Sequence, residues 1–358
     1  MEDGRNRKFT ALLAVAIVAV LAVSCVILTT DDRKESLGFT VREVGGMTHI
    51  TMTADYGFDS YLETGSGDLD AFYDYLKDNV TDGRPINGIT PINCSVFTIA
   101  KDSGTGTYAG RNFDFRYSMP GIIHTDPKDG YASVSTVDLR MFGDTDEPVK
   151  EMGSDSRYSA VPYLPLDGIN EKGVFVCINM VHITQAVVED EEGRVPIFYT
   201  SALRLILDNA ASTEEAMEIL GSYNLRSDVN YHIYVADRSG DARAVEVYDG
   251  QRYVTSTDIM TNHYITEAGP RVPDTDSSVI RYDTIEAAID GVCAMTEVQV
   301  KDVMISVLQD DPDLVHYTRW TAIYDTEDLD VVIWICQPGE DGAMDYSTPH
   351  RHLIPAAA

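Results

Sequence analysis

The sequence predicts an α+β domain built in layers. Runs of residues typical of strands lie on both sides of two pairs of segments with helical spacing. Such an order is typical of helices packed against sheets. The chain has 358 residues, of which 44% are hydrophobic, so it is long and apolar enough to bury a large core.

The N-terminal residues 1–28 predict a signal anchor or a signal peptide. Arg5, Arg7 and Lys8 precede an uninterrupted apolar run from Ala11 to Leu28. This run exceeds the core of most signal peptides and approaches the length of about 20 residues that spans a bilayer. An uncleaved anchor, a cleaved signal and a lipoprotein site at Cys25 are all compatible with it. Each places the bulk of the chain outside the cytoplasm, either secreted or held at the membrane by this segment.

Residues 29–93 are expected to form a lead segment. Phe39 to Tyr56 alternates in the manner of a β-hairpin. Asp68 to Val80 has apolar residues at helical spacing, and Gly83 to Pro91 is rich in Gly, Pro and Asn. The lead segment therefore predicts a hairpin, a helix and a linker that ends at Cys94.

A second hairpin begins at Cys94. Ser95 to Lys101 alternates like a strand, a polar turn follows, and Thr107 to Phe113 returns as a second strand. The return brings Cys94 close to Arg111 and Asp114. A cation there favours a thiolate, and a carboxylate there orients a proton carrier.

The rest of the chain supplies the other expected layers. Ser212 and Glu215 form the pattern of a capping box at the start of a helix. The expected strands are Ala132–Leu139, Val174–Val181, Tyr231–Asp237, Ala242–Tyr248, Tyr253–Thr257, Thr318–Tyr324 and Leu329–Cys336. The expected helices are Ile197–Ala211, Thr213–Tyr223, Ser278–Ile289 and Thr296–Leu308.

Composition and short motifs indicate which classes of partner and cofactor we do not expect the protein to bind. The chain has 58 acidic and 27 basic residues, a formal net charge of −31, which argues against nucleic acid or anionic lipid as the main partner. The glycines from Gly104 to Gly110 do not open a helix, so they are not a dinucleotide fingerprint. His350 and His352 lack further ligands for zinc. We therefore expect no cofactor and no metal.

Four cysteines besides Cys25 form an even set in a compartment that the N-terminus predicts to be oxidising. Cys177 and Cys336 each lie in an apolar strand, where a free thiol behaves as a small hydrophobe. A bridge between these two residues is the alternative. Cys94 by itself is compatible with a buried thiol, a disulfide partner or a nucleophile.

Four motifs in order resemble those of the choloylglycine hydrolases, which include bile salt hydrolases and penicillin V acylases. The resemblance covers about residues 94–336 and implies the four-layer αββα sandwich of N-terminal-nucleophile (Ntn) hydrolases. It implies a catalytic domain at 94–340 and a C-terminal tail at 341–358. The motifs are Cys94 followed by Gly110–Phe115, then Asp167–Gly173 with the strand that ends in Asn179, then Thr261–Tyr264, and finally Tyr317–Trp320.

The resemblance also implies how the hairpin acts. Cys94 becomes the first residue of the mature chain by cleavage of the Asn93–Cys94 bond, and its α-amino group serves as the base. That group has an ordinary pKa of roughly 7.7–8, close to working pH. Asp114 is expected to contact the α-amino group, and Arg111 to lie beside the thiolate. An exposed ion pair at a hairpin end is the plain alternative for these two residues.

Three further residues take roles by the same resemblance. Asn179 and Asn262 are expected in the oxyanion hole, and Arg319 near the nucleophile. From the residues alone, Asn179 is equally a strand-end cap and Asn262 a turn residue. Arg319 is equally a cation stacked on a neighbouring ring.

The sequence thus predicts an enzyme that hydrolyses a linear amide bond in a small N-acylated amine or amino acid, through Cys94 and a thioester. An acyltransferase similar to acyl-CoA:6-aminopenicillanic acid acyltransferase is the alternative within this frame. A disulfide-linked binding domain without catalysis is the alternative outside it. A monomer and a homo-oligomer are both compatible with the sequence.

Overall fold

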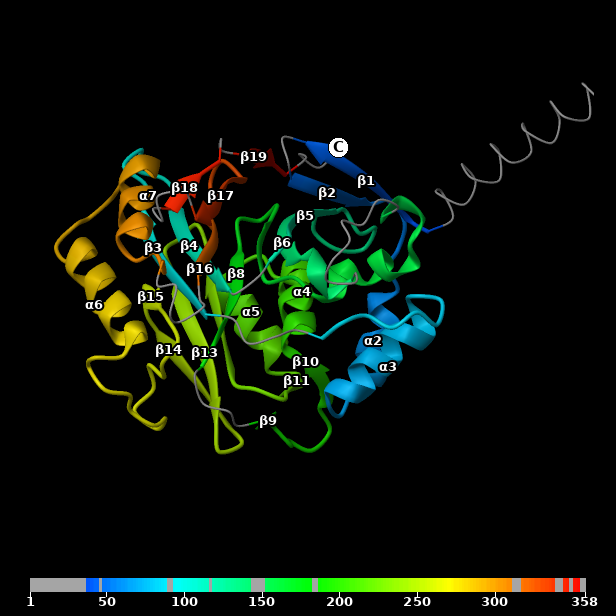
Figure 1. The fold of residues 1–358 in the computed structure, drawn as a ribbon. Coiled ribbons are helices and arrows are strands. Elements are labelled where there is room, and N and C mark those ends of the chain that lie inside the picture. Colours follow the sequence, from blue (N-terminus) through cyan, green and yellow to red (C-terminus); the bar gives the residue numbers. More distant parts are fainter. Residues whose placement is uncertain are drawn as a thin grey trace, which may run out of the picture.

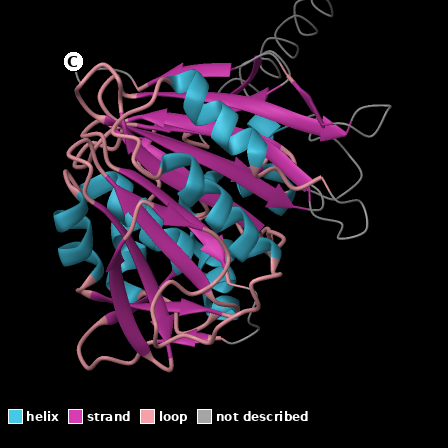
Figure 2. Cartoon of the chain, turned by 90° about the vertical axis from the view of Figure 1, so that its left-hand side faces the viewer, coloured by secondary structure: helices cyan, strands magenta, loops and turns pink. Residues whose placement is uncertain are grey.

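The computed structural model describes residues 37–44, 47–88, 93–115, 118–142, 152–181, 186–310, 317–338, 344–347 and 350–354. Two large sheets lie face to face, and helices cover the outer side of each (Figure 1). The expected four-layer αββα sandwich is therefore confirmed. Figure 2 shows the strands of the sheets running between the helices.

The first sheet has nine strands, and most neighbours in it are antiparallel. The exception is the parallel pair β2–β5, which joins the lead segment to the sheet. In spatial order the strands are β1 (Phe39–Val44), β2 (Met47–Met52), β5 (Pro120–Thr125), β6 (Ser133–Asp138), β7 (Asp167–Asn170), β8 (Phe175–Met180), β12 (Tyr231–Ala236), β13 (Ala242–Tyr248) and β14 (Gln251–Ser256).

The second sheet has seven strands and contains the hairpin that begins at Cys94. Its strands are β15 (Ile259–Met260), β3 (Asn93–Ala100), β4 (Thr107–Phe115), β16 (Tyr317–Asp325), β17 (Asp330–Pro338), β18 (Met344–Tyr346) and β19 (His350–Leu353), the last paired with β17. A small third sheet has the order β10 (Val195–Phe198), β11 (Tyr223–Ser227) and β9 (Val187–Val188).

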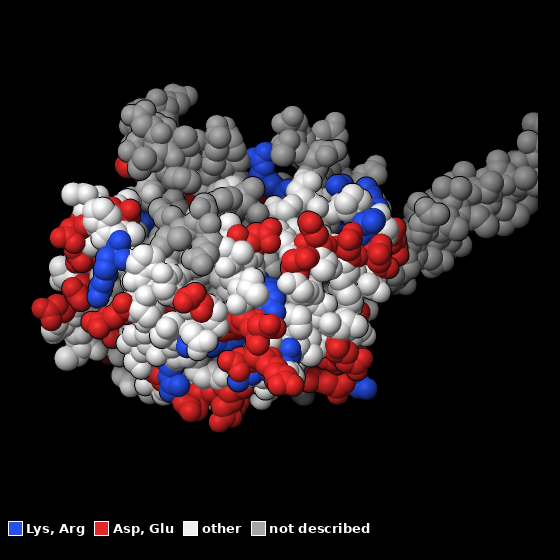
Figure 3. Space-filling model, turned by 90° about the horizontal axis from the view of Figure 1, so that it is seen from below, with Lys and Arg blue, Asp and Glu red and all other residues white. Residues whose placement is uncertain are grey.

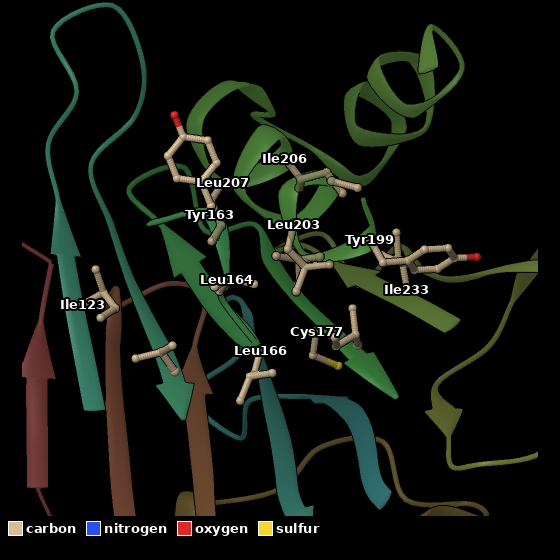
Figure 4. Packing of buried hydrophobic residues seen from close by; sticks show 14 of the residues in the cluster. Ile123, Tyr163, Leu164, Leu166, Cys177, Tyr199, Leu203, Ile206, Leu207 and Ile233 are labelled. Carbon is tan, nitrogen blue, oxygen red and sulfur yellow. The ribbon is translucent and has the colours of Figure 1, made fainter. Parts of the chain in front are cut away.

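One helix pair covers each large sheet. Helix α4 (Tyr199–Asn209) packs on β7, β8 and β12, and α5 (Thr213–Leu220) packs beside it. Figure 4 shows the apolar side chains of α4 directed at the nine-stranded sheet. Helices α6 (Ser277–Ile289) and α7 (Glu297–Ser306) pack on β3, β4 and β16 from the opposite side. The central strands, such as β6, β8 and β12, are thus buried on both faces, which explains why they carry apolar runs, whereas the edge strands β1 and β14 are largely exposed.

The lead segment is built into the first sheet. Its hairpin β1–β2 forms the edge of that sheet, as the alternation predicted, and α3 (Leu69–Asn79) is the expected helix. An additional short helix, α2 (Phe58–Thr64), packs near β10. The ring of Phe72 from α3 stacks on Phe198 with ring centroids 4.9 Å apart. Tyr61 of α2 accepts a hydrogen bond from the backbone N–H of Phe198 at 3.0 Å.

Several elements differ from the sequence prediction. The helix expected at Ile197 begins at Tyr199, because the residues before it extend as β10 beside β11. Strand β7 was missed, since Asp, Gly and Asn rarely favour strands. At Gly168 a Cβ atom would lie 2.8 Å from the Cβ of Ser135, so close packing explains the glycine. The short 3₁₀ turns η1 (Leu139–Met141), η2 (Met152–Ser154) and η3 (Ser156–Tyr163) were also not predicted.

The two ends of the chain are described only in part. Residues 1–28, the predicted anchor or signal, lie outside the described residues. Within the described ranges, no helix is long and apolar enough to cross a membrane. At the other end, two short strands of the segment 341–358 pair with β17. Figure 3 shows acidic side chains gathered over one face, in keeping with the net charge.

Candidate active site

Cys94 is the second residue of β3, and its side chain is fully buried. The antiparallel register places Cys94 opposite Phe113. On that facing strand, Phe113 comes two residues after Arg111 and one residue before Asp114. The predicted hairpin therefore brings the three residues together. Each polar atom of Cys94 has a partner: Sγ lies 3.3 Å from Nη2 of Arg111, and the backbone N donates to Oδ1 of Asn262 at 3.1 Å. The backbone carbonyl accepts from Nη1 of Arg281 at 2.9 Å.

Arg111 is completely buried and has four kinds of partner. Its Nε donates to the buried carboxylate of Asp167, and Nη1 donates to Oδ1 of Asn179 at 2.7 Å. Nη2 is shared between Sγ of Cys94 and the carbonyl of Ile178, the latter at 2.8 Å. The guanidinium is thus oriented by a carboxylate and an amide, and a buried charge that is paired in this way avoids an uncompensated desolvation cost.

Asp114 is buried and faces hydroxyl, amide and guanidinium groups. Its carboxylate accepts from the hydroxyl of Thr318 at 2.6 Å and from Nε2 of Gln309 at 2.8 Å. Nη1 of Arg281 lies 3.8 Å away. In the uncut chain the peptide nitrogen of Cys94 donates to Asn262. The expected contact of Asp114 with the free α-amino group concerns the cleaved chain and stays a prediction.

The two asparagines differ in what their amide groups do. Nδ2 of Asn179 donates to the carbonyls of Met260 and Thr261, each at 3.1 Å, and lies 3.5 Å from the carbonyl of Cys94. Both hydrogens of this amide are therefore donated to backbone carbonyls in the segment just before Asn262. In Asn262 the amide oxygen faces Cys94, and Nδ2 donates to the carbonyl of Met180 at 2.7 Å.

Arg319 lies on β16, where its Nε donates to the carbonyl of Phe115 at 2.8 Å. Its guanidinium carbon lies over the ring of Tyr317, 5.4 Å from the centroid. These contacts correspond to the stacked cation that the sequence left open as the plain alternative. Its expected place near the nucleophile stays a prediction.

Two charged residues of the site were missed by the sequence reading. Arg281, on α6, contacts both Cys94 and Asn262. Its helix was predicted, but nothing local distinguishes this arginine from others. Asp167 lies in a motif that the resemblance used, yet it was not assigned a role. Its place at the start of that motif was the available signal, because a carboxylate that becomes buried needs a cation or several donors.

Burial controls the ionisation of the site in this uncut chain. Loss of solvent raises the pKa of the Cys94 thiol to about 11, although Arg111 opposes the rise. The pKa of Asp114 is also raised by burial, against the lowering effect of Arg281, Thr318 and Gln309. Cys94 is therefore a protonated thiol in this form, and a base is needed to activate it.

Among the described residues, the cysteines form no disulfide and the potential metal ligands form no metal site. Cys94, Cys177, Cys293 and Cys336 are free thiols, so the Cys177–Cys336 bridge is not formed. No group of three or more potential metal ligands occurs among the described residues.

Comparisons with known proteins identify the family of the chain. Residues 158–340, just over half of the chain, match the family model described as acyl-coenzyme A:6-aminopenicillanic acid acyl-transferase. The matched span contains Asp167, Asn179, Asn262 and Arg281 but begins after Cys94. No curated protein matches the chain.

Two solved structures have the same fold. Two mutant forms of the conjugated bile acid hydrolase from Clostridium perfringens match with a TM-score of 0.52, at 15% and 14% identity. Each match covers 71% of this chain, and 91% and 92% of the respective hydrolase chain. Penicillin V acylase from Agrobacterium tumefaciens matches at 17% identity with a TM-score of 0.46, over 68% of this chain and 83% of its own. The bile acid hydrolase confirms the Ntn-hydrolase sandwich.

Proposed function

Because the chain belongs to the acyl-coenzyme A:6-aminopenicillanic acid acyl-transferase family, we propose that it is an Ntn cysteine amidase. Its substrate is a small N-acylated amine or amino acid with a linear amide bond. One observation carries the proposal: the buried guanidinium of Arg111 lies 3.3 Å from Sγ of Cys94, the second residue of β3, and the bond to be cut joins Cys94 to the residue before it. A cation at that distance stabilises a thiolate.

The first step makes the catalyst. The thiol of Cys94 attacks the carbonyl carbon of Asn93, the C–N bond breaks, and the thiol proton goes to the leaving nitrogen. Water then hydrolyses the thioester, which leaves a carboxylate on Asn93 and a free α-amino group on Cys94. This group is the base that the site otherwise lacks, since its ordinary pKa of roughly 7.7–8 suits neutral pH.

The catalytic cycle repeats this chemistry on substrate. The α-amino group takes the proton of the Cys94 thiol, and sulfur attacks the substrate carbonyl. The protonated α-amino group then gives its proton to the leaving amine, and a thioester remains. Water, deprotonated by the same α-amino group, releases the acid and restores the thiol.

We assign the oxyanion donor to Asn262. Its Nδ2 carries two hydrogens, and the bond to Met180 uses one of them. Asn179 has both hydrogens directed at backbone carbonyls, so its oxyanion role requires that those bonds open; in the uncut chain it orients Arg111 instead. Preorganised donors of this kind act mainly on the transition state.

An acyltransferase is the second candidate, and the family match supports it. The thioester of Cys94 is common to both reactions, and only the acceptor differs: water gives a hydrolase, and an amine gives a transferase. Penicillin V, a glycine-conjugated bile acid, and an acyl-CoA mixed with 6-aminopenicillanic acid are suitable probes. Release of free acid favours the hydrolase, whereas formation of a new amide from the acyl-CoA favours the transferase.

N-terminal sequencing of the purified, active protein tests the mechanism. We expect a fragment that begins at Cys94, and a Cys94→Ala chain that stays uncut. An active wild-type enzyme that remains a single uncut chain would exclude the α-amino base and with it this mechanism.

We also propose that the enzyme acts outside the cytoplasm, with residues 1–28 as anchor or export signal. The basic residues before the apolar run support an N-terminus that stays inside. Protease added to intact cells should then digest an anchored enzyme. A secreted enzyme should instead be present in the medium. Full protection of the chain in intact cells, with digestion only after lysis, would contradict this location.

A further inference from the structure

Arg281 and Asn262 grip Cys94 from both sides of its backbone. Asn262 accepts from the nitrogen of Cys94, which is the nitrogen of the bond to be cut. Nη1 of Arg281 donates to the carbonyl of Cys94, and its Nη2 donates to the same amide oxygen of Asn262 at 2.7 Å. We propose that Arg281 is a positioning residue for the chain's own cleavage before Cys94. This inference rests on the proposed function.

The geometry explains why such a grip matters. Attack of Sγ on the preceding carbonyl depends on how the Asn93–Cys94 peptide plane is turned relative to the Cys94 side chain. A bond to N–H fixes that plane, a bond to the carbonyl fixes the other side of the residue, and Arg111 fixes the sulfur. Correct orientation of the reacting groups accelerates an intramolecular reaction, and a small misplacement slows it by about a hundredfold.

Arg281 also decides which way the Asn262 amide points. Oδ1 of Asn262 accepts from two donors, and one of them is the guanidinium, so the oxygen is held toward the backbone nitrogen of Cys94 while Nδ2 keeps its bond to the carbonyl of Met180. A hydrogen bond from a charged donor is stronger than one from a neutral donor. Without Arg281 the amide loses this preference, and the nitrogen of Cys94 loses a fixed acceptor.

Helix α6 supplies a second hold on the same asparagine. One turn before Arg281, the hydroxyl of Ser278 accepts from the backbone N–H of Asn262 at 2.7 Å and donates to Oγ1 of Thr261 at 2.9 Å. Residues three apart on a helix lie on one face. Ser278 therefore holds the backbone of Asn262 while Arg281 holds its side chain, and both act on cleavage through Asn262.

The test measures the rate of cleavage, so it needs no knowledge of the substrate. Full-length protein is followed by pulse–chase labelling and by sequencing of the new N-terminus. We expect Arg281→Ala to slow cleavage by about a hundredfold. Arg281→Lys should recover part of the rate, because it keeps a charged donor but not the two-pronged fork. Ser278→Ala should slow cleavage to a smaller degree.

Chemical rescue separates positioning from folding. Methylguanidinium at millimolar concentration should accelerate cleavage of folded Arg281→Ala, since it restores the missing cation in the cavity left by truncation. Arg204 is the matched control: it is also fully buried, but its partners, among them Thr125, Ser133 and Asp208, do not contact Cys94 or Asn262. Folded Arg204→Ala should be cleaved at the wild-type rate and should not respond to methylguanidinium.

The outcomes distinguish failure of the proposed function from failure of the proposed role of Arg281. A wild-type chain that is never cut before Cys94 overturns the proposed function. A wild-type chain that is cut, with Arg281→Ala and Ser278→Ala cut at the same rate, overturns only the role of Arg281. If Arg281→Ala does not fold, Ser278→Ala and Arg281→Lys decide: cleavage at the wild-type rate in both overturns the inference, and slower cleavage in both supports it.

Discussion

The guanidinium of Arg111 lies against the sulfur of Cys94, with Nη2 and Sγ 3.3 Å apart. In the uncut chain this contact does not suffice to ionise the thiol, because burial raises its pKa to about 11. In the proposed mechanism, release of an α-amino group next to the sulfur supplies the proton acceptor that the buried thiol needs. Activation of the thiol would then depend on cleavage before Cys94, and the following predictions test the parts of this proposal.

Replacement of the nucleophile should abolish turnover without loss of the fold. Cys94→Ser exchanges a thiol for a hydroxyl, which is a far poorer nucleophile near neutral pH. Amide hydrolysis should fall to background, while the circular dichroism spectrum stays native. Cys177→Ser is the control: that thiol is also buried, so the change should lower the free energy of unfolding more than it lowers turnover. Wild-type turnover by Cys94→Ser would contradict the assignment.

Loss of the oxyanion donor should act on kcat. We expect Asn262→Ala, in enzyme that has matured, to lower kcat by roughly 10²–10³ with a modest change in KM, because the donor is used mainly in the transition state. Steady-state kinetics on penicillin V or a conjugated bile acid measure this. Asn79→Ala, at an exposed helix end, should leave both constants unchanged. An effect confined to KM would make Asn262 a substrate-binding or structural residue instead.

The two fragments should stay together after cleavage. The lead segment keeps its strand β2 paired with β5 and its aromatic residues packed on Phe198, none of which depends on the cut bond. We expect co-purification under native conditions and separation in denaturant. Phe72→Ala removes a buried ring, a change that costs about 3–5 kcal/mol, so the fragments should separate at lower denaturant.

The control for this prediction is Val44→Ala on β1, where the side chain is 53% exposed. That variant should separate at the wild-type denaturant concentration. Fragments that part during native gel filtration of the wild type would show that the lead segment does not need to remain docked.

A buried pair should give stability an unusual dependence on pH. Nε2 of His232 lies 3.3 Å from Oε1 of Glu246, and both side chains are fully buried. Burial lowers the pKa of His232 from 6.5 to about 3 and raises the pKa of Glu246 from 4.5 to about 7. Below pH 6.5 the unfolded histidine takes up a proton that the folded one refuses, so stability falls with acid. Between pH 7 and 4.5 the folded glutamate is protonated before the unfolded one, so stability rises with acid.

These opposite contributions nearly cancel between pH 6.5 and 4.5, and single substitutions should reveal each. His232→Gln should gain stability relative to the parent by about 1.4 kcal/mol per pH unit on acidification across that interval. Glu246→Gln should lose a similar amount. Urea unfolding at several pH values, in an uncut Cys94→Ala background, measures both changes. Equal pH slopes in all three chains would refute the opposed titration.

The sequence was most informative where contacts are local. The hairpin from Cys94 to Phe115 follows from alternation and turn residues, and its register alone places Arg111 and Asp114 beside Cys94. Helix α3 follows from apolar spacing, and α5 follows from its capping residues, since Ser212 accepts from the backbone N–H of Glu215. Strands such as β7, made of residues that seldom favour strands, depend on the neighbours around them, and no local pattern announces them.

What the sequence determined by itself is therefore the hairpin that places Cys94 beside its nearest cation and carboxylate, together with the layered fold class. The tertiary structure decided the rest. It brought Arg281, 187 residues away in the sequence, into a hydrogen bond with the carbonyl of Cys94, and it placed Asn262 where its amide oxygen accepts from the nitrogen of Cys94. It also built the lead segment into the edge of the first sheet. The physical reason is that short-range pattern fixes the direction and register of one hairpin, whereas contacts between layers depend on how whole sheets and helices pack.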